Sequence, residues 1–363
     1  MKKTGRRAFS PDEIIFSVTD ECNLKCQHCF VGRSEKKLDA EKAKNLIKNC
    51  IEETKNCEVQ DETDIQEKSA KASFSQGVQW KVGFSGGEPF LNLDFLCKVS
   101  SFCVENEILF DRIMTNALWW KNEDELKKKL TRLYESGYDG KIAISFDSFH
   151  GGDFRKTAKF CRAVYEIWQN PTMIEIQTTY SPIKTSLHTL EKQKKVLTLL
   201  ALELKGKFKS KSGKKNNYIC ATNENCDFFI RVDINRQVFS SENPLAWQSK
   251  KWFKEDYCTP LGNIFYVHTD GNIAPCCGYA NENPALFIGT IDDDYETLVK
   301  NGRENKIAKI CFEKGLEKWV KENAYSETTT TSESSIGSKA PVAIYRKTED
   351  KCTLCDFICK QSG

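Results

Sequence analysis

The sequence predicts an α/β protein in which short strands alternate with amphipathic helices around a parallel sheet. Between residue 12 and about residue 235, short β-branched, aromatic or aliphatic runs recur, and stretches with apolar residues at three- and four-residue spacing separate them. The length of 363 residues exceeds the usual size of one domain. We therefore expect a larger domain over residues 1–240 and a smaller one over residues 241–363.

Six runs are short enough to be buried strands of such a sheet. They cover residues 14–19, 80–85, 109–115, 141–146, 173–179 and 228–232. Three stretches between them have the period of a helix: the one that follows Asp39, residues 123–136 and residues 154–168. Asp39 is a candidate cap of the first helix, whose apolar face consists of Ala43, Leu46, Ile47, Cys50 and Ile51.

Three segments interrupt this pattern. Residues 52–77 are polar and acid-rich and residues 326–339 are dominated by Thr and Ser, so we interpret both as insertions or mobile loops. Residues 205–215 contain six lysines. This third segment is interpreted either as a solvated loop or as a contact for an anionic substrate.

Charge and hydropathy restrict the class of protein. The chain has 54 Lys and Arg against 51 Asp and Glu, a net charge of +3, which is too balanced to indicate a nucleic-acid or membrane-surface partner. It has no apolar run of about 18 residues and no apolar core of a signal peptide in its first thirty residues. We expect a cytoplasmic protein that binds neither nucleic acid nor a membrane.

Seventeen cysteines are far more than a chain of this length usually has. In a reducing cytosol they indicate metal or redox chemistry, and the alternative of a disulfide-rich secreted protein lacks a secretion signal. One group lies at residues 22–29, and two others lie at residues 258–277 and 352–359. Cysteines scattered elsewhere are expected to be small buried hydrophobic residues.

Cys22, Cys26 and Cys29 are separated by three and two residues and follow the first predicted strand. A structural zinc site or an electron-transfer [4Fe-4S] cluster uses four protein ligands, so three cysteines leave one position of a cluster open for another ligand. The alternative is a zinc site that His28 or a distant cysteine completes.

These residues resemble the signature of the radical S-adenosylmethionine (SAM) superfamily, in which an aromatic residue, here His28, directly precedes the third cysteine. The resemblance implies a [4Fe-4S] cluster whose open iron binds SAM, and a 5′-deoxyadenosyl radical that abstracts hydrogen from a substrate. It also implies a partial (β/α)6 barrel over residues 12 to about 235. A reductase, flavodoxin or ferredoxin would donate the electron.

A Gly-Gly-Glu sequence ends the second predicted strand. Gly86 and Gly87 allow close approach of another backbone, and Glu88 offers a carboxylate to an ammonium group. The segment resembles the second signature of the family, which implies that it binds the amino group of SAM.

Polar residues also end the third and fourth predicted strands, at the edge where α/β barrels build active sites. Thr115 begins a segment that resembles the Thr-Asn-Gly element of the family, although Ala117 replaces the glycine, and Ser145 with Asp147 resembles the Ser-x-Asp element. The resemblance implies SAM contacts at Thr115 and Ser145. For Asp147 and His150, an active-site role and a turn or helix-cap role remain open.

The later cysteines form a second pattern. Cys258 precedes a strand-like run with an Asp-Gly hairpin signal that ends at Cys276, and a CxxC pair follows at Cys352 and Cys355. A CxxC alone suits zinc, a redox pair or a cluster. The order of these parts resembles the SPASM or twitch extension of radical SAM enzymes.

This second resemblance implies at least one auxiliary [4Fe-4S] cluster. Its preferred ligands are Cys258, Cys276, Cys352 and Cys355, with Cys359 as the substitute for one of them. A second auxiliary cluster is the alternative if Cys277 and Cys359 both bind iron.

Enzymes with this extension most often modify ribosomally made peptides or protein side chains by crosslinking, epimerisation or oxidation, and the resemblance implies that function here. About twenty residues precede the first cysteine, so we expect no separate peptide-recognition domain there. The alternatives are a radical SAM dehydrogenase of a small metabolite and a non-catalytic iron-sulfur or zinc protein. Cys220 or Cys226 is a candidate hydrogen-atom donor for epimerisation, or an ordinary structural cysteine.

Overall fold

The computed structural model describes residues 8–63, 79–210, 217–223, 226–254, 256–258, 262–323 and 347–361. Within these ranges the strands form one open sheet of eleven strands. Its order is β11-β10-β9-β1-β2-β3-β4-β5-β8-β7-β6, so that β11 and β6 are the two edges.

Six neighbouring strands of this sheet are parallel to one another. They are β1 (Glu13–Ser17), β2 (Lys81–Ser85), β3 (Leu109–Thr115), β4 (Lys141–Ser145), β5 (Ile174–Tyr180) and β8 (Cys226–Arg236). Each overlaps one of the six strands predicted from the sequence. The predicted α/β class with a mainly parallel sheet is therefore confirmed.

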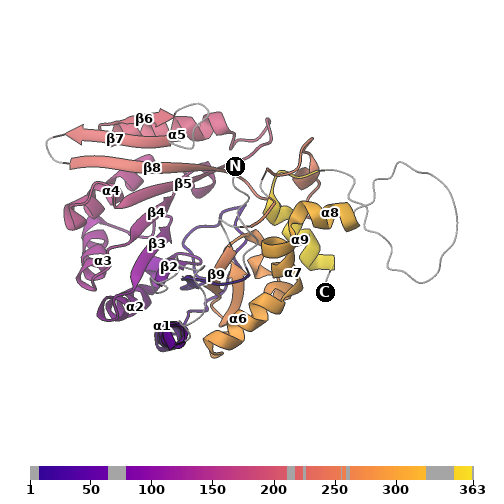
Figure 1. The fold of residues 1–363 in the computed structure, drawn as a ribbon. Helices are drawn as coiled ribbons and strands as arrows, with labels where there is room; N and C mark the ends of the chain where they lie inside the picture. Colours follow the sequence, from indigo (N-terminus) through magenta and orange to yellow (C-terminus); the bar gives the residue numbers. More distant parts are fainter. Residues whose placement is uncertain are drawn as a thin grey trace.

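Helices connect these strands and cover the outside of the sheet, as Figure 1 shows for α1 to α4. They are α1 (Ala40–Thr63), α2 (Leu93–Glu105), α3 (Glu123–Glu135), α4 (Phe154–Trp168) and α5 (Leu190–Glu203). Each packs against the next. The carboxylate of Asp39 caps α1 as predicted, because its Oδ1 accepts from the backbone N–H groups of Glu41 at 2.8 Å and Lys42 at 2.9 Å.

Of the two interpretations of residues 52–77, an insertion or a mobile loop, the loop is wrong for the first part, because α1 continues to Thr63. Four of the residues 52–63 are Glu, which is a good helix former. The rest of that segment and the predicted mobile loop at residues 326–339 lie outside the described residues.

The lysine-rich segment is also not simply a loop. Its residues Lys207–Ser210 form strand β6, which pairs with β7 (Asn217–Asn223), and β7 pairs with β8, both antiparallel. Lysines are suited to an edge strand because their charges discourage pairing with another chain. Phe208 packs against the hydrophobic core from this strand.

On the other side of β1 the sheet continues into the C-terminal part of the chain. β9 (Gly262–Val267) is parallel to β1, with Ile14 opposite Phe265, and the antiparallel strand β10 (Asn272–Cys276) follows. The predicted Asp-Gly turn joins them, and Gly271 has a φ of +88°, which favours glycine. The strand β11 (Gly289–Thr290) ends the sheet. The proposed boundary between residues 240 and 241 stays a prediction.

The C-terminal helices form a smaller unit with its own core of buried residues, which includes Leu286, Ile307, Leu316, Leu354 and Ile358. The elements are α6 (Tyr295–Glu304), α7 (Lys306–Lys309), the π-helical segment η6 (Ile310–Lys314), α8 (Leu316–Asn323) and α9 (Lys351–Gln361). Figure 1 shows α7, α8 and α9 gathered on the side of β9. None of the described helices is both long and apolar enough to span a membrane.

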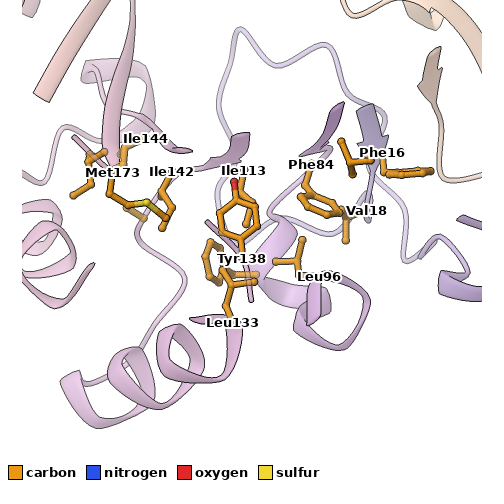
Figure 2. Packing of buried hydrophobic residues seen from close by; sticks show 14 of the residues in the cluster. Phe16, Val18, Phe84, Leu96, Ile113, Leu133, Tyr138, Ile142, Ile144 and Met173 are labelled. Atoms are coloured by element: carbon orange, nitrogen blue, oxygen red, sulfur yellow. The ribbon is translucent and has the colours of Figure 1, made fainter. Parts of the chain in front are cut away.

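The two faces of the parallel strands differ in polarity. One face packs against the helices through side chains such as Phe16, Phe84 and Ile142, which are at most 1% exposed (Figure 2). The opposite face, called the inner face below, carries Ser17 and Ser85 together with Glu13, Asp111, Arg112, Glu175 and Gln177. Because side chains alternate along a strand, one set can build the core while the other is free to line a binding site.

Leu96 on α2 tests the packing of the outer face. Leu96 is 0% exposed, so Leu96→Ala should lower the free energy of unfolding by about 2–5 kcal/mol, through lost burial and the cavity left behind. Leu202 on α5 is 63% exposed, and Leu202→Ala should change the free energy of unfolding by less than about 0.5 kcal/mol. Urea unfolding followed by circular dichroism measures both, and equal losses would contradict this account.

Candidate active site

The first three cysteines lie in the segment between β1 and α1, residues 18–39, called the cysteine loop. Cys22 and Cys29 are exposed and Cys26 is partly buried, and all three are free thiols. In the described part of the chain, no three His, Cys, Asp or Glu side chains converge as a single metal ion requires. The loop starts at the carboxyl end of β1, the edge at which α/β barrels place their active sites.

The glycine turn, residues 86–88, is bonded directly to this loop. The N–H of Gly87 donates to the carbonyl of Thr19 at 2.6 Å, and the N–H of Glu88 donates to the carbonyl of Glu21 at 2.8 Å. A Cβ on Gly86 would lie 2.6 Å from the Thr19 oxygen, and Gly86 has a φ of +113°. The close backbone approach that the glycines allow is therefore an approach to the cysteine loop itself.

Glu88 is completely buried and joins the glycine turn to the end of β3. Its carboxylate accepts from Thr115 Oγ1 at 2.9 Å, from the N–H of Asn116 at 2.8 Å and from the N–H of Phe90 at 3.2 Å. Burial raises the pKa of Glu88 to about 7, although these hydrogen bonds act to lower it. A cation beside this carboxylate would offset the cost of its buried charge.

Asn116 extends this set of hydrogen bonds to the cysteine loop. Its Nδ2 donates to Asn23 Oδ1 at 2.8 Å and lies 3.8 Å from Cys22 Sγ. The next residue, Ala117, is buried with a φ of +58°, the left-handed conformation that favours glycine. Alanine adopts it at a cost of roughly 1–2 kcal/mol.

Asp147 caps the short helix η2 (Ser148–His150) and holds His150 in place. Its Oδ1 accepts from the N–H groups of Phe149 at 2.9 Å and His150 at 3.0 Å and pairs with His150 Nδ1 at 2.8 Å, and its Oδ2 accepts from the N–H of Thr179 at 3.0 Å. The structure thus favours the capping role for Asp147. Burial alone would lower the pKa of His150, but hydrogen bonds with Asp147 and Cys26 raise it to about 9.

His150 therefore links the end of β4 to the cysteine loop, and His28 lies beside it. The ring of His28 is 4.9 Å from that of His150 and 4.6 Å from that of Phe149. Burial and the neighbouring His150 lower the pKa of His28 to about 4, so its ring is neutral. Among the described residues its buried Nδ1 has no hydrogen-bond partner, so this atom remains available to a bound molecule.

Below the loop, the inner face of the sheet is polar. Ser145 is partly buried at the end of β4, one strand from Thr115. Further toward the amino ends of the strands, Arg112 Nη1 donates to Glu175 Oε2 at 3.0 Å. Burial and the nearby Asp111 raise the pKa of Glu13 to about 7. The arrangement suits a substrate with polar or charged groups.

Several of the later cysteines line one cavity, called the cysteine cavity below. Four predicted ligands line it: Cys258 before β9, Cys276 at the end of β10, and Cys352 and Cys355 on α9. Burial raises the pKa of Cys276 and Cys352 well above the usual value. These thiols are therefore neutral unless a metal ion binds them, and a group of buried thiols around a space fits an iron-sulfur cluster.

Two other predicted residues do not line this cavity. Cys359 is buried in the same apolar cluster, but it is not among the residues that line the cavity. The pKa of Cys277 is raised to about 12 by burial and by Glu13 of the inner face. The structure therefore does not bring Cys277 and Cys359 together. A fifth cysteine that lines the cavity, Cys311, was not predicted, because a lone cysteine far from the others in sequence carries no motif.

The two candidate hydrogen-atom donors lie away from the cysteine loop in the sheet. Cys220 is on β7, next to the edge strand β6, and Cys226 is the first residue of β8. Neither strand neighbours β1, β2, β3 or β4. The structure therefore gives no support to a role for either cysteine at the loop.

Comparison with known proteins identifies the domain that contains the cysteine loop. Residues 16–164 match the model of the Radical SAM superfamily. The chain contains a radical SAM domain. The match includes the cysteine loop, the glycine turn, Thr115 and Ser145. A radical SAM domain implies SAM and a [4Fe-4S] cluster, and the three free thiols of the loop and the nearby Nδ1 of His28 are consistent with both.

Curated relatives share part of this radical SAM domain. A stretch of 151 residues is 26% identical to an uncharacterized protein of Methanocaldococcus jannaschii, covering 40% of this chain and 42% of that protein. A stretch of 144 residues is 33% identical to GTP 3′,8-cyclase of Listeria monocytogenes serovar 1/2a, covering 40% of this chain and 36% of that enzyme. The chain thus spans about two fifths of the length of these relatives.

Among solved structures, that of BtrN in complex with AdoMet and 2-DOIA aligns with a TM-score of 0.39 at 14% sequence identity. The alignment covers 85% of this chain and 89% of that chain. A score this low supports no inference about this protein.

Gly86 tests the contact between the glycine turn and the cysteine loop of the radical SAM domain. Gly86→Ala should displace the loop, because the added methyl group meets the Thr19 oxygen, and the variant should bind about four fewer irons per chain after anaerobic reconstitution. Gly32→Ala is the matched control in the same loop, since a Cβ there has no neighbour within 4 Å. If Gly32→Ala lost as much iron as Gly86→Ala, the close approach of Gly86 to the Thr19 carbonyl would not be the cause of the loss.

The Asp147–His150 pair predicts a pH dependence of stability. Protonated His150 contributes to the free energy of unfolding. This contribution is fully present below about pH 6.5, the pKa of an unfolded histidine, and is lost as pH rises through about 9. Burial acts to raise the pKa of Asp147, but hydrogen bonds, of which that with His150 is the largest, hold it below its usual value. The contribution of ionised Asp147 to the free energy of unfolding is therefore lost only as pH falls below about 4.

Asp147→Asn should therefore destabilise the protein by about 3 kcal/mol near pH 6, and its difference from wild type should narrow between pH 6.5 and 9. The matched control is Asp153→Asn, because Asp153 caps α4 through the N–H of Lys156 and asparagine caps equally well. Thermal unfolding at several pH values measures both. A pH-independent difference for Asp147→Asn would count against the ion pair.

Proposed function

We propose that this chain is a radical SAM enzyme that cleaves SAM reductively and removes a hydrogen atom from a substrate. One observation carries the proposal: the loop with the three cysteines is hydrogen-bonded to the glycine turn, and Glu88 connects that turn to Thr115 and Asn116. Three segments that are far apart in sequence and each resemble a family element thus meet at the carboxyl edge of a parallel sheet.

Each residue has a defined role in this proposal. Cys22, Cys26 and Cys29 hold the cluster, and the Asn116 amide beside Cys22 orients the first of these thiolates. Glu88 supplies negative charge for the ammonium group of SAM and positions the end of β3. Thr115 and Ser145 lie at the ends of adjacent strands, where they would contact SAM. When bound, the cluster and SAM would together supply the radical that abstracts hydrogen.

The cysteine cavity supports a second cofactor site, an auxiliary [4Fe-4S] cluster held by Cys258, Cys276, Cys352 and Cys355. The support is the enclosure of these thiols around one space with apolar neighbours such as Leu286 and Leu316. The polar inner face lies between this site and the cysteine loop, because β9 and β1 run parallel and the two groups of cysteines lie near opposite ends of these strands. A substrate on the inner face would therefore lie between the two clusters.

We propose a ribosomally made peptide or a protein side chain as substrate, modified by crosslinking, epimerisation or oxidation. The order of the later cysteines, which resembles the SPASM or twitch extension, supports this choice. A small metabolite is the second candidate, and the likeness to GTP 3′,8-cyclase, whose name specifies a nucleotide substrate, favours it. Both candidates need an electron donor such as a flavodoxin, a ferredoxin or a reductase.

Iron analysis with a SAM cleavage assay tests the proposal. Wild-type protein, reconstituted without oxygen and reduced, should convert SAM to 5′-deoxyadenosine, because the reduced cluster that Cys22, Cys26 and Cys29 would hold can supply one electron. The Cys22→Ala/Cys26→Ala/Cys29→Ala variant should release none and retain about four irons per chain. Cys50→Ala, which removes a cysteine of the α1 core, is the control and should still cleave SAM.

Three other outcomes are informative. No cleavage by the wild type would establish the non-catalytic alternative. About eight irons in the triple variant would indicate two auxiliary clusters. No iron in that variant would refute the auxiliary site, whereas SAM cleavage by the wild type would still support the radical SAM assignment.

A further inference from the structure

The cysteine cavity contains one more thiol than a [4Fe-4S] cluster with four protein ligands uses. Its lining includes Cys258, Cys276, Cys352 and Cys355, the four ligands proposed above, and also Cys311. Cys311 is 4% exposed, so its thiol belongs to the interior of this unit and not to its surface. The fifth thiol needs an explanation, because the four others already complete a ligand set.

Cys311 is held in the cavity wall by an unusual piece of backbone. It lies in η6, a single π-helical turn, and π-turns within helices occur frequently at functional sites. Its carbonyl accepts from the N–H of Cys258 at 2.9 Å, which ties it to the segment of the first predicted ligand. The π-turn thus coincides with the part of the chain that contributes Cys311 to the cavity wall.

The sulfur atoms of Cys311 and Cys355 are 3.7 Å apart, which is contact distance for two sulfur atoms. In a [4Fe-4S] cluster each thiolate binds a different iron at a different corner, so two ligand sulfur atoms in contact with each other do not fit two corners. They fit one corner, which one or the other sulfur occupies. The remaining thiol then donates an S–H hydrogen bond to the sulfur that is bound.

We propose that Cys311 and Cys355 are alternative ligands for the same iron of the auxiliary cluster. When Cys311 replaces Cys355, one iron–sulfur bond breaks and one forms, and the proton of the Cys311 thiol moves to the sulfur of Cys355. The cluster keeps its charge and oxidation state, and no further reactant is needed. The inference deepens the proposed function, since it rests on an auxiliary cluster in this cavity.

Cys359 does not share this role. It is buried and its thiol also hydrogen-bonds that of Cys355, but unlike Cys311 it is not among the residues that line the cavity. This assigns the spare thiol to Cys311, whereas the sequence pattern favoured Cys359 as the substitute. Cys359 is therefore the matched control: a buried cysteine of α9, one turn from Cys355, that should not affect iron binding.

The test uses the full chain with Cys22, Cys26 and Cys29 replaced by alanine, so that all bound iron reports on the auxiliary site. Iron and acid-labile sulfide are measured after anaerobic reconstitution, and circular dichroism confirms folding. Cys311→Ala, Cys355→Ala and Cys359→Ala should each retain about four irons. Cys311→Ala/Cys355→Ala should lose the cluster, and so should Cys352→Ala alone.

A second measurement distinguishes exchange of the two ligands from a cluster that simply does not need either thiol. The electron paramagnetic resonance spectrum of the reduced cluster should differ between Cys311→Ala and Cys355→Ala, because a different thiolate binds the iron in each. The proposal is overturned if a folded Cys355→Ala variant binds no iron, or if the double variant still binds four. An iron-free starting protein would refute the auxiliary cluster itself, whereas SAM cleavage by the wild type would still support the radical SAM assignment.

Discussion

The buried carboxylate of Glu88 is the interaction on which the candidate active site depends. The cysteine loop has no helix or strand of its own, and besides hydrogen bonds within the loop, such as that from the N–H of Asp20 to the Lys36 carbonyl, it is held by contacts with the glycine turn and the end of β3. Glu88, in the glycine turn, accepts hydrogen bonds from the N–H groups of Phe90 and of Asn116 at the end of β3, and the Asn116 side chain donates to Asn23 in the loop. A buried carboxylate without such donors would cost several kcal/mol, which is why the three segments are held together and not merely adjacent.

Because side chains alternate along each strand, one face of the sheet builds the hydrophobic core and the other carries polar groups. Residues such as Phe16, Phe84 and Ile144 face the helices and build the core. In closed eight-stranded barrels bulky aliphatic side chains fill the interior as well. Here the inner face instead carries groups such as Arg112 and Glu175, which bond to each other. The outer core therefore leaves the inner face free to receive cofactor and substrate.

Much of the fold could be predicted from sequence because the parallel strands are short apolar runs between helices of clear period. The edge strand β6 was missed because its sequence, Lys-Phe-Lys-Ser, has the composition of a solvated loop. For Glu88 the sequence indicated a carboxylate and an ammonium partner, but its bonds to Thr115 and Asn116 depend on how β2 and β3 end side by side. The place of Cys311 depends on one π-turn, which has no sequence signature.

The pairing of β1 has a consequence for how the chain folds. β1 lies between β2 and β9, and Ile14 is opposite Val82 on one side and Phe265 on the other. During synthesis, β9 emerges about 250 residues after β1, which at 5–20 residues per second is roughly 12–50 s. Throughout that time one edge of β1 lacks its final partner, and an open strand edge invites pairing with other chains. The open edge of β1 is therefore covered only when β9, from the C-terminal part of the chain, pairs with it.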